Sequence, residues 1–361
     1  MEALTIFDLM PEEEAKKYKP IKSTDWKWTM ANDYPKEKNG LKVFSCFACG
    51  GGSTMGYKLA GCEVVGCCEI DPKMNEVYIN NHHPKHNFLM DIRQFNQIPN
   101  EQLPEELFNL DILDGSPPCT TFSMAGEREE SWGKKKKFRE GQAEQTLDDL
   151  SFVFIETVAK LRPKVMIMEN VEGLLKGEAW SYVQRIYKEL HDIGYKVNHW
   201  LLKGEQMGVP QTRHRVFFIA TREDIDLDEL DMSFNYEPIK FKEIKDSVVI
   251  PPSDSVVNLI QKAIPNRDKT LADVLIRLEG RNSRFNECIV WDDNVCPTIH
   301  NHGHYRGDDV SKFTRLDFIH AQSFPEDYDE CNQSIGYICG MSVPPHNDKA
   351  NSHKAHREWG V

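Results

Sequence analysis

Apolar residues along the chain gather in short runs and in helically spaced sets, a pattern that predicts an α/β fold. The runs expected to form buried strands are Val43–Phe47, Val64–Cys68, Val165–Met168, Lys196–Leu202 and Arg215–Ala220, the last two as a hairpin. Apolar residues recur at helical spacing over 147–161, where Pro163 stops the helix, and over 183–190, closed by Gly194. We therefore expect a doubly wound sheet with polar residues at its strand ends.

A cysteine follows one predicted strand end on stiff backbone. The apolar run 110–113 leads into the stretch 114–123, where Pro117 and Pro118 fix φ and remove two backbone donors before Cys119. In open α/β sheets, ligands and catalytic groups lie beyond the carboxyl ends of the strands. These residues fit a reactive cysteine, and they also fit an incidental thiol on a proline-stiffened loop.

A glycine-rich turn follows the first strand. The turn 49–56 carries Gly50, Gly51 and Gly52, and the next strand ends in Glu69. Strand, glycine turn, helix, strand and acid form the layout of a nucleotide-binding βαβ unit, in which the acid accepts hydrogen bonds from ribose hydroxyls. The layout suits NAD and S-adenosylmethionine equally well.

Composition narrows the classes of protein. With 361 residues, the chain is long enough for two domains, and its net charge is −13. An acidic balance is unusual for a nucleic-acid-binding protein, so a DNA partner would require basic residues concentrated on one face. The run 134–139 is the candidate, with a solvated loop as the alternative.

No apolar run reaches the roughly 18 residues of a membrane helix, and we expect a cytoplasmic protein with reduced cysteines and no membrane partner.

Histidines cluster late in the chain. His300, His302 and His304 suggest a metal site by composition, but we see no cysteine or carboxylate at suitable spacing, and we expect no bound metal.

The motifs together resemble one family, the DNA (cytosine-5)-methyltransferases of bacterial or phage restriction-modification type. The matching segments, in family order, are FACGGG from Phe47, the acid Glu69, MDI from Met90, SPPCTTFS from Ser116, ENV from Glu169, QTRHR from Gln211, AQSFPEDY from Ala321 and GMSVPP from Gly340. The resemblance covers nearly the whole chain after residue 40.

The resemblance implies a Rossmann-like S-adenosylmethionine-dependent methyltransferase with a mixed seven-stranded sheet and a smaller, irregular target-recognition domain. Residues 1–40 would be an N-terminal extension, 41–221 and 324–361 the catalytic and cofactor-binding domain, and 222–323 the target-recognition domain. The implied reaction methylates carbon 5 of a cytosine flipped out of a specific sequence in double-stranded DNA, with S-adenosylhomocysteine as product. We expect a monomer in a prokaryotic or phage-infected cell, and a partner endonuclease is not inferable.

Catalytic roles carry over residue by residue. Cys119 matches the nucleophile that adds to C6 of cytosine, since the resulting enamine lets C5 accept a methyl group. Glu169 matches the acid that holds a proton at N3 in a closed pocket, with Asn170 ordering the turn around it. Arg213 and Arg215 match the pair that holds the base, the carboxylate and the phosphate backbone.

Binding roles carry over in the same way. The implied cofactor residues are Phe47, Ala48, Gly50, Gly51, Gly52, Glu69, Ile70, Asp91, Ile92, Pro118, Leu150, Ser342 and Val343. The implied DNA-binding residues are Ser123, Lys134, Lys135, Lys136, Lys137, Arg281 and Arg284, with Lys262 and Arg277 as further basic candidates.

The chain departs from the family pattern at several positions. Cys49 replaces a glycine, which would cost about 1 kcal/mol if the position needs a positive φ. Thr120 replaces the glutamine after the nucleophile, and Met341 replaces an asparagine. Leu316 and Asp317 stand for the arginine and glutamate of the penultimate motif. None of these changes touches Cys119, Glu169 or the two arginines, so we expect activity.

Three alternatives remain. A tRNA cytosine-5 methyltransferase shares most of the motifs, although the variable module of roughly 80 residues favours a defined DNA sequence. A catalytically inactive regulatory relative would have no need of Cys119 or Glu169. An NAD dehydrogenase explains the glycine turn and Glu69 but not the Pro-Pro-Cys stretch.

Overall fold

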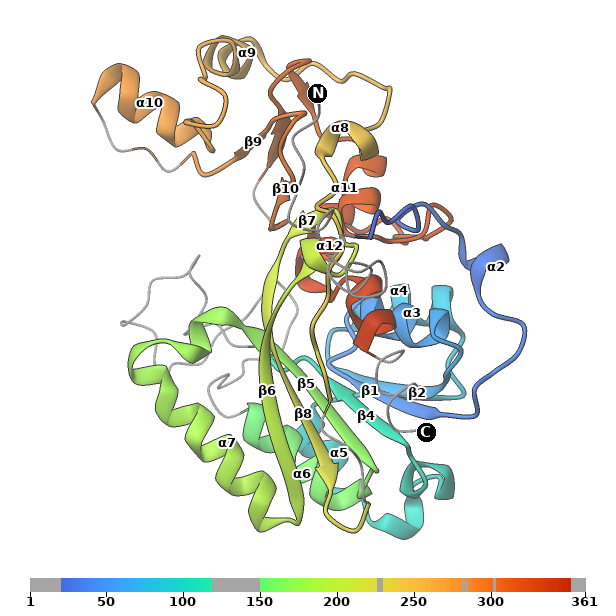
Figure 1. Ribbon diagram of the computed structural model, residues 1–361. Coiled ribbons are helices and arrows are strands. Elements are labelled where there is room, and N and C mark those ends of the chain that lie inside the picture. The colour runs from blue at the N-terminus through green and yellow to red at the C-terminus, as the bar shows by residue number, and fades with distance from the viewer. Residues whose placement is uncertain are drawn as a thin grey trace, which may run out of the picture.

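The computed structural model describes residues 21–118, 150–225, 230–280, 283, 285–300 and 303–351. A mixed sheet of seven strands lies at the centre of this part of the chain, in the order β3-β2-β1-β4-β5-β8-β6 (Figure 1). The strands are β1 (Lys42–Cys46), β2 (Glu63–Glu69), β3 (His86–Leu89), β4 (Ile112–Gly115), β5 (Val165–Val171), β6 (Tyr195–Lys203) and β8 (His214–Arg222). The strands β1 to β5 pair in parallel, and β8 is antiparallel to both of its neighbours. The predicted seven-stranded mixed sheet and its β6–β8 hairpin pair are confirmed.

Helices cover both faces of the sheet. The helices α3 (Gly52–Leu59), α4 (Pro72–His82) and α12 (Ile335–Met341) lie on one side in Figure 1. On the other side are α5 (Ile92–Gln97), α6 (Leu150–Leu161) and α7 (Trp180–Asp192). The short 3-10 helices are η2 (Asn100–Gln102), η3 (Glu105–Phe108), η5 (Glu172–Leu175), η6 (Gly177–Ala179) and η7 (Gly204–Gln206).

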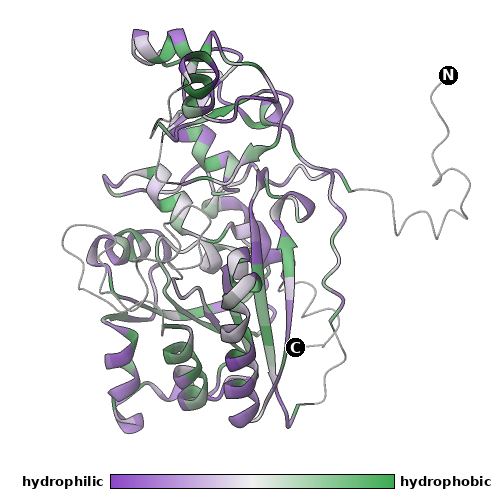
Figure 2. Ribbon diagram, turned by 90° about the vertical axis from the view of Figure 1, so that its left-hand side faces the viewer, coloured by the Kyte–Doolittle hydropathy of each residue, from purple (hydrophilic) through white to green (hydrophobic). Residues whose placement is uncertain are grey.

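The apolar periodicity of the sequence accounts for this layering. Successive residues of a strand point to opposite faces, and neighbouring residues of β1 accordingly join different cores: Phe44 packs with α5 and α6, and Val43 packs with Tyr57 of α3. Helix α7 buries Val183, Ile186 and Leu190, spaced along one side of the helix. Figure 2 shows the corresponding colours, with hydrophobic residues along the strands and hydrophilic residues on outer helix turns.

A smaller module lies beyond the carboxyl edge of the sheet (Figure 1). Its strands, β9 (Cys288–Val290), β11 (His304–Arg306) and β12 (Ser311–Lys312), form a sheet in the order β12-β11-β9. Its helices are α8 (Phe241–Ile244), α9 (Asp254–Ile260) and α10 (Leu271–Glu279). Val274 of α10 and Ile289 of β9 belong to a separate hydrophobic core, as expected for a module with its own interior. The boundaries of 222 and 323 stay a prediction.

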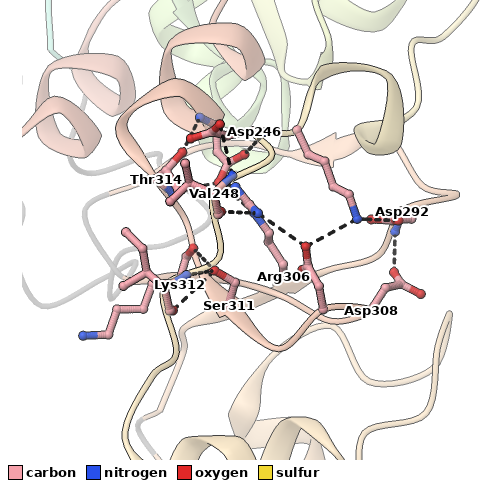
Figure 3. Close-up of polar contacts among 12 residues, drawn as sticks. Asp246, Val248, Asp292, Arg306, Asp308, Ser311, Lys312 and Thr314 are labelled. Carbon is pink, nitrogen blue, oxygen red and sulfur yellow. Dashed lines mark hydrogen bonds and ion pairs between the residues drawn. The ribbon is translucent and has the colours of Figure 1, made fainter.

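Within the described ranges, β7 and α11 both help to attach this module to the rest of the protein. The short strand β7 (Gln211–Thr212) pairs in parallel with β10 (Cys296–Pro297). The helix α11 (Arg315–Ala321) follows β12, and its Asp317 pairs with the fully buried Arg306 of β11 at 2.6 Å. Figure 3 shows the polar network around Arg306, which also donates to the Val248 carbonyl at 2.8 Å. A buried ion pair therefore links the strand to the start of α11.

The described part of the N-terminal extension packs on the main domain. Trp28 is buried and its indole nitrogen donates to the Ser323 carbonyl at 2.9 Å, while the helix α2 (Met30–Asp33) follows directly. The Asp327 carboxylate accepts from the amide of Met30 at 2.8 Å, at the start of α2. None of the helices within the described ranges is long and apolar enough to cross a membrane.

Candidate active site and cofactor pocket

The glycine turn after β1 packs closely against α4 and the segment that follows α12. Cys49 has φ 45°, so the substituted position does lie in the left-handed region, as the sequence suggested it could. Gly51 has φ 85°, and a Cβ added there would lie 1.9 Å from His82 Nε2. A Cβ on Gly52 would lie 2.0 Å from the Val343 carbonyl oxygen. The two glycines are needed because α4 and the segment after α12 approach the turn so closely.

Replacing Gly51 with alanine should destabilise the fold by about 2–4 kcal/mol, the sum of a left-handed φ and an overpacked contact with His82. Gly280 provides a matched control, because it has φ 66° and no atom within 4 Å of an added Cβ. Gly280→Ala should therefore cost only about 1 kcal/mol. Equilibrium urea unfolding of both variants measures the difference. Equal losses would show that the contact with His82 carries no energy.

Glu69, at the end of β2, holds the turn by its carboxylate. Oε2 accepts from the amide of Cys49 at 2.7 Å, and Oε1 accepts from the amides of Ile70 at 2.9 Å and Asp71 at 2.8 Å. Burial raises the pKa of Glu69, although these amides counteract the shift. A carboxylate offers about four acceptor positions, so one remains for a ligand hydroxyl after these three bonds.

A pocket opens over this turn, at the carboxyl ends of the first strands of the sheet. Seven predicted cofactor residues line it: Phe47, Glu69, Ile70, Asp91, Ile92, Pro118 and Leu150. The other described lining residues are Cys49, Cys68, Asp71, Met74, Met90, Ser116, Tyr337 and Met341. The substituted position Met341 thus lies at the pocket. The pocket combines apolar walls with carboxylates at two strand ends.

The remaining predicted cofactor residues form the turn or pack against it and are not among the residues that line the pocket. Ala48 packs with Cys67 and Tyr78 in a small buried cluster. Ser342 and Val343 are buried against Gly52, and Gly50 lies against Tyr328, whose hydroxyl donates to the Gly50 carbonyl at 2.6 Å. The resemblance implied that all of these residues contact the cofactor, but the sequence could not separate residues that face the pocket from residues that support the turn.

Three predicted catalytic residues meet beyond β5 and β8. Glu169, near the end of β5, is buried and its Oε1 lies 2.9 Å from Nε of Arg215. Arg213 is also buried, and its Nη1 donates to the Gly340 carbonyl at 3.2 Å. Burial, followed by the adjacent charge of Arg215, lowers the pKa of the Arg213 guanidinium. The structure therefore brings together one carboxylate and two cations from segments far apart in sequence.

Asn170 connects this group to the proline segment. Its side-chain amide donates to the Pro117 carbonyl at 3.5 Å, and its Oδ1 accepts from the amide of Val171 at 2.8 Å. The expected ordering role of Asn170 thus has a structural counterpart at the carboxyl end of β4. Cys119 and Thr120 lie outside the described residues, as do Ser123, Lys134, Lys135, Lys136, Lys137, Arg281, Arg284 and His302.

One further basic candidate is engaged within the protein. The Arg277 guanidinium contacts the Asp268 carboxylate at 2.7 Å and also donates to the Lys262 carbonyl. An arginine held by an internal carboxylate contributes less to a nucleic-acid interface, because its charge is already compensated. The suggestion that Arg277 contacts DNA is therefore not favoured by this geometry.

Sequence reasoning assigned no role to two buried glutamines. The Gln211 amide donates to Gln322 Oε1 at 2.8 Å, and the Gln322 amide donates to the Ser342 carbonyl at 2.7 Å. Gln211 Oε1 also accepts from the amide of Ile299 at 3.1 Å. These bonds join β7, the end of α11 and the segment after α12 behind Arg213. Both glutamines lie inside segments that match the family motifs, and this position in the motifs was the one feature of the sequence that could have identified them.

Two buried aspartates lie beneath the site. Asp114, at the end of β4, accepts from the hydroxyls of Ser45 at 3.0 Å and Tyr57 at 3.2 Å. Burial raises the pKa of Asp114 to about 7, and the charge of Glu169 adds to the effect. Burial and then the charge of Asp114 raise the pKa of Asp348 as well. Both aspartates therefore bind a proton more tightly in the folded protein than in the unfolded chain.

Asp114→Asn should change the pH dependence of stability. Since the folded-state pKa is raised above the unfolded value of about 3.9, the contribution of wild-type Asp114 is fully present below that value and is lost as pH rises through about 7. The variant should therefore gain stability relative to wild type as pH rises from about 5 to 8, by on the order of 1 kcal/mol or more. Urea unfolding at each pH measures this, and parallel profiles would contradict it.

The mixed seven-stranded sheet, the glycine turn after β1 and the acid that ends β2 define a Rossmann-like, nucleotide-binding fold. Among solved structures, a prophage-encoded E. coli protein assigned as a DNA modification methyltransferase matches with TM-score 0.67 and 14% identity. The match covers 89% of this chain and 100% of that one, which supports the fold.

The chain belongs to the C-5 cytosine-specific DNA methylase family, whose model matches residues 41–305. The Type II methyltransferase M.FnuDI of Fusobacterium nucleatum is 31% identical over 63% of this chain and 58% of its own length. M.NgoPII of Neisseria gonorrhoeae is 29% identical over 73% of each chain. The matched segment thus spans between about half and three quarters of the length of these relatives.

Proposed function

We propose that the chain transfers a methyl group from S-adenosylmethionine to carbon 5 of cytosine in double-stranded DNA. The observation that carries the proposal is the adjacency of the pocket over the glycine turn to the group formed by Glu169, Arg213 and Arg215. Pro118 lines that pocket, and Cys119 follows it directly in sequence. Family membership supports the same reaction.

The described pocket residues fit the cofactor chemically. Phe47, Ile70 and Leu150 offer apolar surface for an adenine ring, while Glu69 and Asp91 offer carboxylates for hydroxyl and amino groups. The acceptor position that remains on Glu69 after three backbone bonds suits a ribose hydroxyl. When bound, S-adenosylmethionine supplies an electrophilic methyl group.

The residues of the chain account for the remaining chemistry. The Cys119 thiolate would add to C6 of a flipped-out cytosine, which makes C5 nucleophilic, and would leave again when the C5 proton is removed. Glu169 would hydrogen-bond at N3 and counter the negative charge that develops in the ring. Arg215 orients the Glu169 carboxylate through its contact at 2.9 Å, and Arg213 is anchored on the Gly340 carbonyl.

The decisive experiment compares substrates. Purified full-length protein with labelled cofactor should methylate unmethylated duplex DNA and leave bulk tRNA unlabelled, and bisulfite sequencing should locate the product in one recurring sequence. Label in tRNA alone would make the protein an RNA methyltransferase, and label in neither would support the inactive relative. Duplexes containing 5-fluorocytosine should trap a covalent complex with wild type but not with Cys119→Ser.

A further inference from the structure

A thiol and two imidazoles meet in the small module, outside the pocket and the catalytic group. Cys288 begins β9 and His304 begins β11, and the two residues are direct partners in the parallel register of these strands. His300 comes from the segment after β10, and its Nε2 lies 3.3 Å from Cys288 Sγ. The rings of His300 and His304 have centroids 4.8 Å apart. One donor atom from each residue lies within 4.8 Å of the other two.

The surroundings of this group are apolar. Cys288 and His304 are buried, and the His304 ring packs against Phe313 at 5.3 Å and Phe318 at 5.6 Å. Three side chains that can ligate a metal therefore gather in an apolar interior, where apolar side chains would pack equally well.

The donor set and its geometry suit zinc. Thiolate sulfur and imidazole nitrogen are the ligands that Zn²⁺ prefers, at bond lengths of about 2.3 and 2.0 Å, which separates tetrahedral ligand atoms by about 3.3–3.6 Å. The contact between Cys288 and His300, at 3.3 Å, already has this separation. The remaining pairs of donor atoms, within 4.8 Å of each other, would have to approach by up to about 1.5 Å.

We propose that Cys288, His300 and His304 bind one Zn²⁺ ion, with the fourth tetrahedral position open to water. The sequence expectation of no metal found no cysteine at suitable spacing from the histidines, because Cys288 lies twelve positions before His300 and strand pairing brings it to them. The spacing from His300 to His304 has three intervening residues, as in many zinc-binding histidine pairs.

The ion would act as a brace between the small module and the catalytic group. It would tie β9 and β11 to the segment 298–300, in which the amide of Ile299 donates to Gln211. The backbone of His300 lies against Gly340, whose carbonyl accepts from Arg213. The site is therefore structural in position, and its existence does not depend on which nucleic acid the protein methylates.

Cobalt titration tests the proposal directly. Full-length protein, without a polyhistidine tag, should bind one equivalent of Co²⁺ with the visible bands of tetrahedral coordination and a thiolate charge-transfer band in the near ultraviolet. Zn²⁺ should abolish both. Cys288→Ser should lose the charge-transfer band and weaken Co²⁺ binding at least about tenfold, whereas Cys331→Ser, a change at a half-buried thiol outside the group, should leave the spectrum intact.

Two further variants test the proposal independently if Cys288→Ser fails to fold. His304→Phe retains an aromatic ring beside Phe313 and Phe318, and His300→Gln changes a half-buried side chain. Each should retain the wild-type circular dichroism spectrum and bind Co²⁺ at least about tenfold more weakly. Absence of a tetrahedral cobalt spectrum in wild type, or an unchanged spectrum in these variants, would overturn the proposal and leave a thiol–imidazole contact of the core.

Discussion

Methyl transfer to duplex DNA should fall by about 10²–10⁴-fold when Glu169 is replaced by glutamine, while cofactor binding stays within a few-fold of wild type. Glutamine keeps the size of the side chain but can neither carry the negative charge nor take up and release the ionisable proton of the carboxyl group. Glu169 is buried beside Arg215, so solvent cannot readily substitute for it. Initial rates with labelled cofactor and calorimetric titration of cofactor binding measure the two quantities separately.

Glu205→Gln is the matched control for this prediction. Its carboxylate is similarly sheltered and accepts from His214 Nε2 at 2.9 Å, but it lies outside the pocket and the catalytic group. The control should change the rate by no more than a few-fold. If Glu169→Gln also retained a rate within about tenfold of wild type, the role proposed for Glu169 would be wrong.

Arg306→Met should destabilise the protein by about 3–5 kcal/mol, because removal of one partner leaves a buried charge uncompensated. Both Arg306 and Asp317 have fully buried side chains, and the guanidinium contacts Asp317 Oδ2 through Nε at 2.9 Å and Nη2 at 2.6 Å. The same oxygen accepts from the amide of Thr314 at 2.7 Å and so caps α11. Equilibrium unfolding in urea measures the loss.

A double-mutant cycle with Asp317→Asn separates the energy of the Arg306–Asp317 ion pair from the energy of the Asp317 cap on α11. The two single changes should be strongly non-additive, because each removes the same interaction. Lys188→Met, which breaks an exposed ion pair with Asp192 on α7, should produce no resolvable change. Additive losses from Arg306→Met and Asp317→Asn would argue that the two side chains stabilise the protein independently.

The Arg306 pair also explains how the chain tolerates its altered penultimate motif. Asp317 caps α11 in a reciprocal arrangement with Thr314, as a longer glutamate could at the same position. The positive charge that balances it comes from Arg306, eleven residues earlier and on a different strand. Leu316, which replaces the usual arginine, does not supply it. Sequence comparison at single positions could register the loss but could not find the partner.

Much of the fold followed from local signals. Apolar runs predicted β1, β2 and β5, and the hairpin of β6 and β8 formed where alternating segments flanked a turn. The order of motifs also predicted that Phe47, Glu69, Asp91 and Pro118 would share a pocket. These features depend on neighbours in the chain or on the rule that parallel strands end at one edge.

Other features needed the complete packing. Ser342 and Val343 support the glycine turn from behind, and Arg277 is held by Asp268, although the sequence suggested ligand contacts for all three. The glutamines of β7 and α11 become partners only because the two segments meet behind Arg213. Each contact joins positions whose separation in sequence gives no periodic signal.

The sequence by itself determined which segments become strands and helices, where the glycine turn and proline segment lie, and which family the chain resembles. These features depend on the conformational preferences of neighbouring residues and on the order of the motifs. Only the tertiary structure decided which side chains face the pocket, which cation balances Asp317, and that Cys288 joins two histidines. Those outcomes depend on how elements distant in sequence cross and approach one another, and burial then makes each unpaired charge or polar group costly enough to fix its partner.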